Sequence, residues 1–465
     1  MLRSCSQNGS KTLRLTTGAR YRPIRRYHYI QTRQVHNTPP WRPATTLDEW
    51  VGKEARPISL RQLMVFGRSL TEARLISSAN YVRTELPTRL AHRIRDMQTL
   101  PYVVVTNPHI SQVYELYYKA FESLRKVREI KTLEDNEKFC KKISQTLQEH
   151  LTVIPKLSMG VIECRDLMKP EDMDKFMNTI LRSRISRRVI AEQHLALTDT
   201  FNSPWHFPDS PNASNSGTEF VGEVFLKCNA GEVVNRCYNT ILSLCSATYG
   251  ATTPLPQLKL SGHLDATFPY ILSHLEYIIG ELLRNSIQAV VERQKSSPRG
   301  WDETPPAIEV TVCEAPQHVI IRVSDQGGGV PHDILPYLWS FSKGPRSSQR
   351  LENLTQVPKM AATLQELRVS SDIPTHLHTP PHSEGHEKSE HSGSGHDSSL
   401  SSLSSRPPNL RLGMGLPLSR VYAEYWAGNL ELHSLEGYGV DAFLQISKLG
   451  NKNEQLTMRA SMDAV

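Results

Sequence analysis

A strand-like segment that ends in three consecutive glycines constrains the fold more than any other part of the sequence. Residues 318–323 alternate in the manner of a half-buried β-strand, and Asp325-Gln326-Gly327-Gly328-Gly329 follows directly. A plain strand-to-helix turn accounts for one glycine but not for three. Consecutive glycines let the backbone approach a ligand closely, and an aspartate at a strand end can accept a hydrogen bond from an amino group.

The surrounding segments mix the strand period with the helix period. Strands are expected at 307–312, 318–323, 430–433 and 441–446, and helices at 268–294 and 415–427. Hairpins and helices interleaved in this way predict an α/β sandwich over 216–450, with a mixed sheet and helices on one face.

The preceding part of the chain has a helical pattern only. Apolar residues recur at three- and four-residue steps from Ile58 onward, and 168–197 reads as a long helix. Prolines, including Pro87, are expected to interrupt these helices. An antiparallel helical bundle over 55–205 is predicted, with a domain boundary in the Ser-, Asn-, Gly- and Pro-rich stretch 202–218. The fold class is therefore α+β.

The positive charge of the chain is confined to its first residues. The net charge is +7, but nine basic residues and no acidic one precede Asp48, so the rest of the chain carries −2. An Arg-rich, acid-free start predicts a mitochondrial transit peptide with linker over 1–47. The alternative is a basic arm that binds nucleic acid or anionic lipid. The neutral body predicts no nucleic-acid partner, and no apolar run of about 18 residues suggests a membrane span.

Two segments lack the composition of a packed core. Residues 370–405 are rich in Ser, His, Gly and Pro and are expected to be a disordered insertion in a loop. Their histidines could bind metal, but their irregular spacing favours a plain polar tract: His376, His378, His382, His386, His391 and His396. Residues 451–465 are expected to form a flexible tail.

The helix expected at 268–294 carries polar residues suited to catalysis. Glu281, Asn285 and Gln288 stand at i, i+4 and i+7, so they share one helix face. A carboxylate can take a proton from a nucleophile, and an amide oxygen one turn away can ligate Mg²⁺. The alternative is an ordinary solvated polar face.

Glycines also mark the start of the helix expected at 415–427. Gly413-Met414-Gly415-Leu416 would present free N–H groups to phosphate oxygens, which the helix dipole also favours. This G-x-G is weak by itself. A last pair, Gly437 and Gly439, reads as a hairpin turn.

The order of these motifs is more specific than any one of them. An E-x-x-x-N helix, D-x-G-x-G, a long loop and G-x-G-L opening a helix resemble the GHKL ATPase superfamily, which includes histidine kinases, Hsp90-type chaperones and type II topoisomerases. Residues 346–409 fall where those proteins carry a mobile ATP lid, so a long inserted lid is expected there.

Longer stretches resemble the mitochondrial pyruvate dehydrogenase kinase and branched-chain ketoacid dehydrogenase kinase family. The resemblance covers nearly all of 58–450 outside the insertion. It rests on 85–94 (ELPTRLAHRI), 100–108 (LPYVVVTNP), 150–155, 160–163, 192–197, 338–345 (LWSFSKGP) and 419–425 (SRVYAEY).

The resemblance implies a site for ATP and Mg²⁺. Glu281 would be the general base, Asn285 the Mg²⁺ ligand and Asp325 the residue that reads adenine, and His150 would lie near the base and orient it, unless it is an ordinary core or surface histidine. The implied ATP-binding residues are Glu281, Leu282, Leu283, Arg284, Asn285, Ser286, Ile287, Gln288, Asp325, Gly327, Gly329, Ser342, Lys343, Arg411, Leu412, Gly413, Met414, Gly415 and Leu416.

The resemblance also implies a function. It predicts a serine kinase of the mitochondrial matrix that phosphorylates and inactivates the E1 alpha subunit of pyruvate dehydrogenase or, alternatively, of the branched-chain complex. The lipoyl domain of the E2 core and a second copy of the chain would be further partners. Tyr277, Arg411 and Val440 depart from the family pattern and leave the substrate open. A histidine kinase with His194 as phosphoacceptor, or a non-catalytic ATP-gated scaffold, are the rival interpretations.

Overall fold

The computed structural model describes residues 44–68, 70–202, 220–296, 304–363, 366, 406–450 and 452–456. The leader up to residue 43, the predicted domain boundary after residue 202 and the histidine-rich tract 370–405 lie outside the described residues. The predicted leader boundary at residue 47 falls inside the first helix, where Leu47 is buried.

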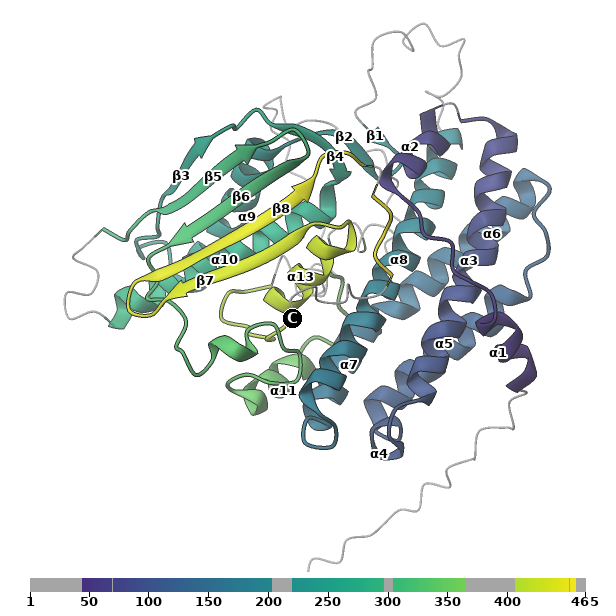
Figure 1. The fold of residues 1–465 in the computed structure, drawn as a ribbon, viewed down its shortest axis with the longest axis horizontal. Coiled ribbons are helices and arrows are strands. Elements are labelled where there is room, and N and C mark those ends of the chain that lie inside the picture. Colours follow the sequence, from purple (N-terminus) through teal and green to yellow (C-terminus); the bar gives the residue numbers. More distant parts are fainter. Residues whose placement is uncertain are drawn as a thin grey trace, which may run out of the picture. The chain divides into compact units, whose positions relative to one another are not determined.

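Helices alone make up the described chain before residue 203 (Figure 1). They are α1 (Ala44–Val51), α2 (Leu60–Arg68), α3 (Glu72–Gln98), α4 (Tyr102–Val105), α5 (Pro108–Arg125), α6 (Leu133–Glu149), the 3-10 turn η1 (His150–Thr152), α7 (Val153–Glu163) and α8 (Pro170–Asn202). Helix α3 packs against both α5 and α8, and α5 packs against α7. This arrangement confirms the expected helical region.

Polar caps and prolines set most of the helix starts. The side chain of Asn107 accepts from the N–H groups of His109 and Ile110 at the start of α5, where Pro108 is the first residue. Pro87 does not interrupt a helix as predicted, since it lies inside α3. Its neighbours Leu86 and Leu90 are buried, and their burial outweighs the cost of about 3 kcal/mol for a proline inside a helix.

The second half contains two sheets. A three-stranded antiparallel sheet has the order β1 (Phe220–Val221), β2 (Val224–Asn229) and β4 (Thr267–Ile271). A five-stranded sheet has the order β3 (Leu258–Gly262), β5 (Ile308–Glu314), β6 (His318–Asp325), β8 (Gly439–Ser447) and β7 (Asn429–Leu435). β3 pairs with β5 in parallel and the other pairs are antiparallel, so the five-stranded sheet is mixed, as predicted.

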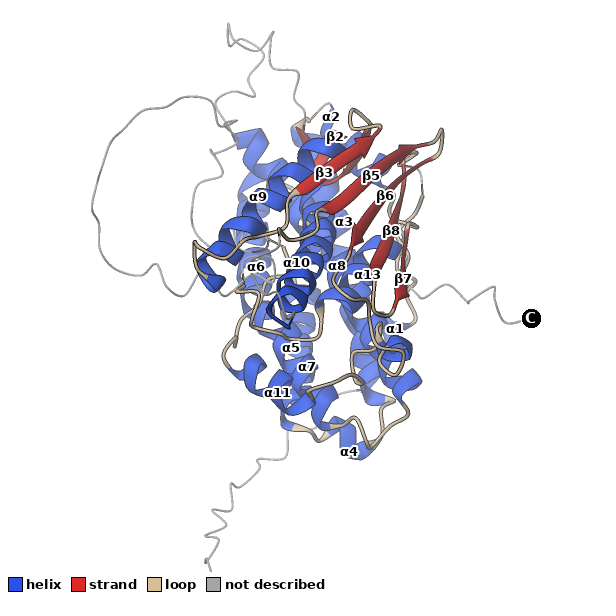
Figure 2. Ribbon diagram, turned by 90° about the vertical axis from the view of Figure 1, so that its left-hand side faces the viewer, coloured by secondary structure: helices blue, strands red, loops and turns tan. Residues whose placement is uncertain are grey.

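Helices cover one side of the five-stranded sheet (Figure 2). α10 (Leu272–Ser296) and α13 (Gly415–Tyr425) pack on the strands, and α9 (Ala230–Tyr249) packs against α10. The helix predicted from residue 268 begins later, because 268–271 belong to β4. Polar residues of α10 such as Glu281 and Arg284 are buried as well as its apolar ones, which include Leu275, Ile278, Ile279, Leu282, Leu283 and Ile287. A helix enclosed in this way can place polar side chains in a nearly water-free setting.

Strand β6 delivers a polar residue to the covered side of the sheet. Val319, Ile321 and Val323 are at most 1% exposed and share one face of the strand. Asp325 follows in the same phase, so its carboxylate points toward the helices rather than to the open face. The strand period therefore places the aspartate beside α10.

The last described residues are fixed, contrary to the flexible tail predicted for 451–465. Glu454 is buried, lies 2.7 Å from a guanidinium nitrogen of Arg89 in α3, and accepts a hydrogen bond from the Tyr425 hydroxyl. Its backbone N–H donates to the carbonyl of Ile58. Composition gave no sign of this, because the segment is polar and it is held by one carboxylate and by backbone hydrogen bonds to distant residues. Residues 457–465 lie outside the described ranges.

Ion pairs and hydrogen bonds join the helical bundle to the C-terminal half of the chain at several points. Arg182 of α8 pairs with Glu424 of α13, and Asp174 of α8 accepts from the backbone N–H groups of Phe341 and Ser342. Glu366, from the expected lid, pairs with Arg184 of α8. Across the described ranges, none of the helices combines the length and apolar character needed to traverse a bilayer.

Candidate active site

Glu281 lies in the middle of α10 and is 1% exposed, so the alternative of a solvated polar face is wrong. Its Oε1 accepts from Nη1 of Arg406 at 3.0 Å, and its Oε2 accepts from Nη2 of the same residue at 2.9 Å. Nε of Arg284 lies 3.4 Å from Oε1. A buried carboxylate needs such partners, because losing them would leave an uncompensated charge.

Asn285 stands one helical turn after Glu281, but its side chain is only partly buried. It makes no hydrogen bond with any residue in the ranges that the structure describes. An unoccupied carboxamide oxygen one turn from a carboxylate is suited to Mg²⁺, which prefers oxygen ligands. Gln288, in contrast, is buried and donates to Glu292 at 3.1 Å.

Asp325 is pinned in one orientation. Its Oδ2 accepts from the hydroxyl of Ser286 at 2.8 Å, and its Oδ1 accepts from the backbone N–H of Gly327 at 2.8 Å. Burial raises the pKa of Asp325, although these hydrogen bonds oppose the shift. The structure thus brings together Ser286 of α10 with Asp325 and Gly327 of the D-x-G-x-G motif, three residues that the resemblance assigned to one site.

The glycines after β6 allow the loop to pack closely against its neighbours. A Cβ on Gly327 would lie 2.4 Å from the Cβ of Ala289 in α10, so only glycine lets this loop meet the helix. Gly329 has φ +74, and a Cβ there would lie 2.4 Å from the carbonyl oxygen of Leu435. Both neighbours belong to this chain, so close packing is a structural reason for these glycines in addition to the predicted approach of a ligand.

The first residue of α13 touches the candidate catalytic carboxylate. A Cβ on Gly415 would lie 2.1 Å from Oε2 of Glu281. The positive end of the α13 dipole therefore faces the same point as Arg406 and Arg284. Leu412 and Met414 are buried in the core, and Leu416 is half-buried against it. A helix start beside a carboxylate is a favourable place for a phosphate group.

Arg350 connects two predicted parts of the site that are far apart in sequence. It extends from α11 (Ser347–Thr355) and donates to the carbonyls of Phe341, Lys343 and Leu412. A Cβ on Gly413 would meet its guanidinium. Sequence reasoning missed Arg350 and Arg406, because neither lies in a motif and both flank a tract of low complexity.

The remaining predicted residues lie at the periphery of this cluster. Ser342 is 1% exposed and its N–H donates to Asp174, while Lys343 is half-buried. Arg411 pairs with Glu292 on the surface. Leu282, Leu283 and Ile287 face the hydrophobic core, so their side chains serve to hold α10 in place.

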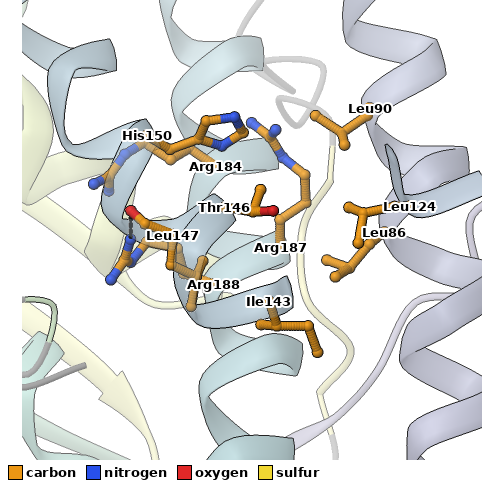
Figure 3. Close-up of a pocket in the computed structure, with 10 residues that line it drawn as sticks. All are labelled: Leu86, Leu90, Leu124, Ile143, Thr146, Leu147, His150, Arg184, Arg187 and Arg188. Atoms are coloured by element: carbon orange, nitrogen blue, oxygen red, sulfur yellow. Dashed lines mark hydrogen bonds between the residues drawn. The ribbon is translucent and has the colours of Figure 1, made fainter. Parts of the chain in front are cut away.

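His150 makes no hydrogen bond, ion pair or ring contact with Glu281 in the described part of the chain. It lies at the end of α6, with its ring centroid 5.4 Å from that of Tyr117, and it lines a separate cavity. The cavity is lined by Leu86, Leu90, Leu124, Ile143, Thr146, Leu147, His150, Arg184, Arg187 and Arg188. Leu86, Leu90 and Leu124 lie opposite His150 and Arg184, with Arg187 between the two groups, whereas Leu147 lies on the side of Arg184 (Figure 3).

The cavity around His150 is basic and small. Its volume is about 20 Å³, room for about one water molecule. Burial, followed by the positive charge of Arg187, lowers the pKa of His150 to about 3, so the imidazole is neutral at pH 7. A neutral ring 8% exposed fits a core histidine better than a residue that orients the general base.

His194, the phosphoacceptor of the rival histidine-kinase interpretation, is fully buried. Its Nε2 is 2.9 Å from Oδ1 of Asn136 and its Nδ1 is 3.2 Å from the hydroxyl of Ser78. Both ring nitrogens are thus engaged inside the bundle. This arrangement argues against transfer of a phosphoryl group to His194.

His274 gives the α10–α13 contact a pH dependence. Its ring packs 4.7 Å from that of Tyr422, and burial lowers its pKa to about 3. The pKa of His274 in the folded protein lies below its value of about 6.5 in the unfolded chain. The contribution of the neutral imidazole to the free energy of unfolding is therefore fully present above pH 6.5 and declines as the pH falls below it. From pH 7.5 to 5.5, wild type should lose about 1.4 kcal/mol more unfolding free energy than His274→Phe.

Urea titrations of both proteins at the two pH values measure this difference. Other titrating groups, including Glu192, whose pKa burial raises to about 7, contribute equally to both proteins and cancel. Equal losses in the two proteins would contradict a buried, neutral His274.

The fold and the site together define the class of the protein: a helical domain joined to an ATPase of the histidine kinase, DNA gyrase B and HSP90 type. The family model of that description matches residues 271–449. A second model, described as mitochondrial branched-chain alpha-ketoacid dehydrogenase kinase, matches residues 57–225.

Curated relatives match over most of the chain. Pyruvate dehydrogenase (acetyl-transferring) kinase 2, mitochondrial, of Saccharomyces cerevisiae is 32% identical, over 93% of this chain and 87% of the relative. The mitochondrial pyruvate dehydrogenase kinase of Arabidopsis thaliana is 30% identical, over 88% and 94%. That of Drosophila melanogaster is 27% identical, over 89% and 86%.

The chain belongs to the family of mitochondrial pyruvate dehydrogenase and branched-chain alpha-ketoacid dehydrogenase kinases. It is an ATP-dependent protein kinase. The family resemblance, the fold class and the use of ATP predicted from the sequence are thereby confirmed.

Proposed function

We propose that this kinase transfers the γ-phosphoryl group of ATP to a serine of the E1 alpha subunit of pyruvate dehydrogenase and so inactivates that complex. The observation that carries the chemistry is the buried Glu281 carboxylate, with Asn285 one turn along α10 and the start of α13 against it. The names of the relatives from three organisms support pyruvate dehydrogenase as the target.

Each group has a part in the proposed transfer. The serine hydroxyl gives its proton to Glu281 while its oxygen forms a bond to the γ-phosphorus. The bond from that phosphorus to the bridging oxygen breaks, and ADP leaves with the electron pair. Asp325 would accept from the adenine amino group, and the N–H groups at the start of α13 would bind phosphate.

Mg²⁺, held by the Asn285 amide oxygen, would neutralise phosphate charge. The donor set fits this ion, since Asn285 is free of hydrogen bonds to the described residues and is partly exposed. Arg350 would hold the loops 341–343 and 412–413 together around the nucleotide. A closing lid within 346–409 would exclude water and suppress hydrolysis.

The partners and the compartment are also part of the proposal. The bundle, 55–205, would recruit the lipoyl domain of the E2 core, and two copies of the chain would form a dimer. The relatives carry mitochondrial names, and the Arg-rich start of the sequence agrees with import into the mitochondrial matrix.

The test is transfer of γ-phosphate from labelled ATP to purified pyruvate and branched-chain dehydrogenase components in parallel. We expect label on the pyruvate dehydrogenase alpha subunit and a loss of its activity. Preferential label on the branched-chain subunit, which the description of one family model favours, would move the assignment to that complex. No transfer to either, with ATP bound, would indicate a non-catalytic scaffold.

A further inference from the structure

Arg406 holds the carboxylate that the proposed transfer needs. Both of its terminal nitrogens donate to Glu281, its Nε donates to the carbonyl of Leu410 at 3.2 Å, and it is 6% exposed. Its own carbonyl accepts from Arg284. The side chain and the backbone of Arg406 are therefore both fixed against α10.

This ion pair competes with the phosphoryl transfer. The acceptor hydroxyl must come within about 2.6–3.2 Å of Glu281 and about 3–3.5 Å of the γ-phosphorus. The guanidinium lies within 3.0 Å of both carboxylate oxygens, so the hydroxyl and the guanidinium require the same two acceptor atoms. A buried guanidinium that gives up a carboxylate needs a new anionic partner.

The terminal phosphate is the anion that arrives at this point. Because Glu281 would take the proton of the attacking hydroxyl, the γ-phosphate must lie within a few ångströms of the present position of the guanidinium. Gly415, at the positive end of α13, borders the same carboxylate. Guanidinium binds phosphate in the same two-pronged geometry as carboxylate, and phosphate carries more charge.

We propose that Arg406 exchanges Glu281 for the terminal phosphate of ATP, and so becomes a catalytic residue of the loaded enzyme. The exchange frees the base at the moment when its substrate is bound, and it places a positive charge on the group that is transferred. This inference rests on the proposed function in taking Glu281 as the base. The contact with phosphate, however, can be measured without any turnover.

The experiment compares the binding of ATP and ADP, each with Mg²⁺ and without protein substrate, by calorimetric titration. Only ATP has the terminal phosphate, so only ATP can make the contact with Arg406. The free-energy cost of opening the Arg406–Glu281 pair is either the same for both nucleotides or paid by ATP alone. We expect Arg406→Met to lower the preference for ATP over ADP by about tenfold to a hundredfold. ADP should bind as in wild type or more tightly.

Arg322→Met is the matched control. Arg322 also contacts both oxygens of a carboxylate, that of Asp441, at 2.9 Å. This pair joins the neighbouring strands β6 and β8 and does not involve α10. Its loss should leave the nucleotide preference unchanged. If the Met variant does not fold, Arg406→Gln, which keeps one donor for Glu281, replaces it, and the same fall in the preference for ATP over ADP is expected. Arg406→Lys should restore part of the preference.

An unchanged preference for ATP over ADP in the Met or Gln variant would overturn the proposal. A turnover above that of wild type would also overturn it, because Arg406 would then only block Glu281. Failure of the proposed function looks different. If Glu281 is not the base, Glu281→Gln keeps its transfer activity, while the nucleotide preference of the Arg406 variants still reports on the phosphate contact.

Discussion

Glutamine in place of Glu281 should lower the rate of phosphoryl transfer by a factor of about 10²–10⁴, the typical contribution of a general base. The amide has nearly the same shape as the carboxylate but cannot accept the proton of the serine hydroxyl. It can still accept a hydrogen bond from Arg406, but the buried Arg406 and Arg284 lose their anion, so a loss of about 3 kcal/mol in the free energy of unfolding should accompany the change. Single-turnover phosphorylation of the dehydrogenase subunit, with ATP binding measured separately, tests this expectation.

The control for this substitution lies on the same helix. Glu276→Gln removes a partly exposed carboxylate that pairs with Arg236 on the surface, and it should change the rate by less than about twofold. A Glu281→Gln variant with nearly full activity would assign the base to another residue. Loss of ATP binding together with activity would indicate a role in the nucleotide site instead.

Glutamine in place of Glu366 should lower the free energy of unfolding by about 3 kcal/mol. This carboxylate accepts from two nitrogens of Arg184, at 2.8 and 2.6 Å, and lies 3.5 Å from Nε of Arg188. Burial alone would raise the pKa of Glu366, but these arginines hold it below its usual range. Without the charge, Arg188 would keep Glu192 as a partner, but the buried Arg184 would lose the carboxylate that it pairs with.

Chemical unfolding measures the loss, and hydrogen exchange locates it. The N–H of Ala362 donates to Glu366, so amides around 360–363 should exchange faster in the variant. Glu352→Gln, an exposed change in the neighbouring α11, should leave both measurements unchanged. Wild-type stability and exchange in Glu366→Gln would mean that this part of the lid is not held on the bundle in solution.

Sequence alone was sufficient for the parts of the site that depend on period and order. Spacing placed Glu281 and Asn285 one turn apart, and the strand period together with the glycines placed Asp325 at the end of β6. These signals are local, so they survive without knowledge of the tertiary fold. The structure then brought Asp325 and Ser286 into contact, which makes the two motifs a single cluster.

Contacts between distant residues could not be predicted in this way. Arg406 and Arg350 lie in segments without a motif, and their partners are more than a hundred residues or about sixty residues away along the chain. The resemblance implied a place for His150 near the base, yet its contacts lie in the bundle cavity. Pairs of side chains on different elements depend on tertiary packing, and they produce no repeating pattern in the sequence from which they could be predicted.

The contact of Glu454 with Arg89 and Ile58 has a consequence for how the chain folds. The helical half comes first in the sequence, but the anion that completes the environment of its buried Arg89 is separated from Ile58 by 396 residues. Closing so long a loop is slow relative to local folding. A chain that folds from its helical half onward therefore holds an incompletely closed bundle until the segment around Glu454 docks, wherever in the cell that folding takes place.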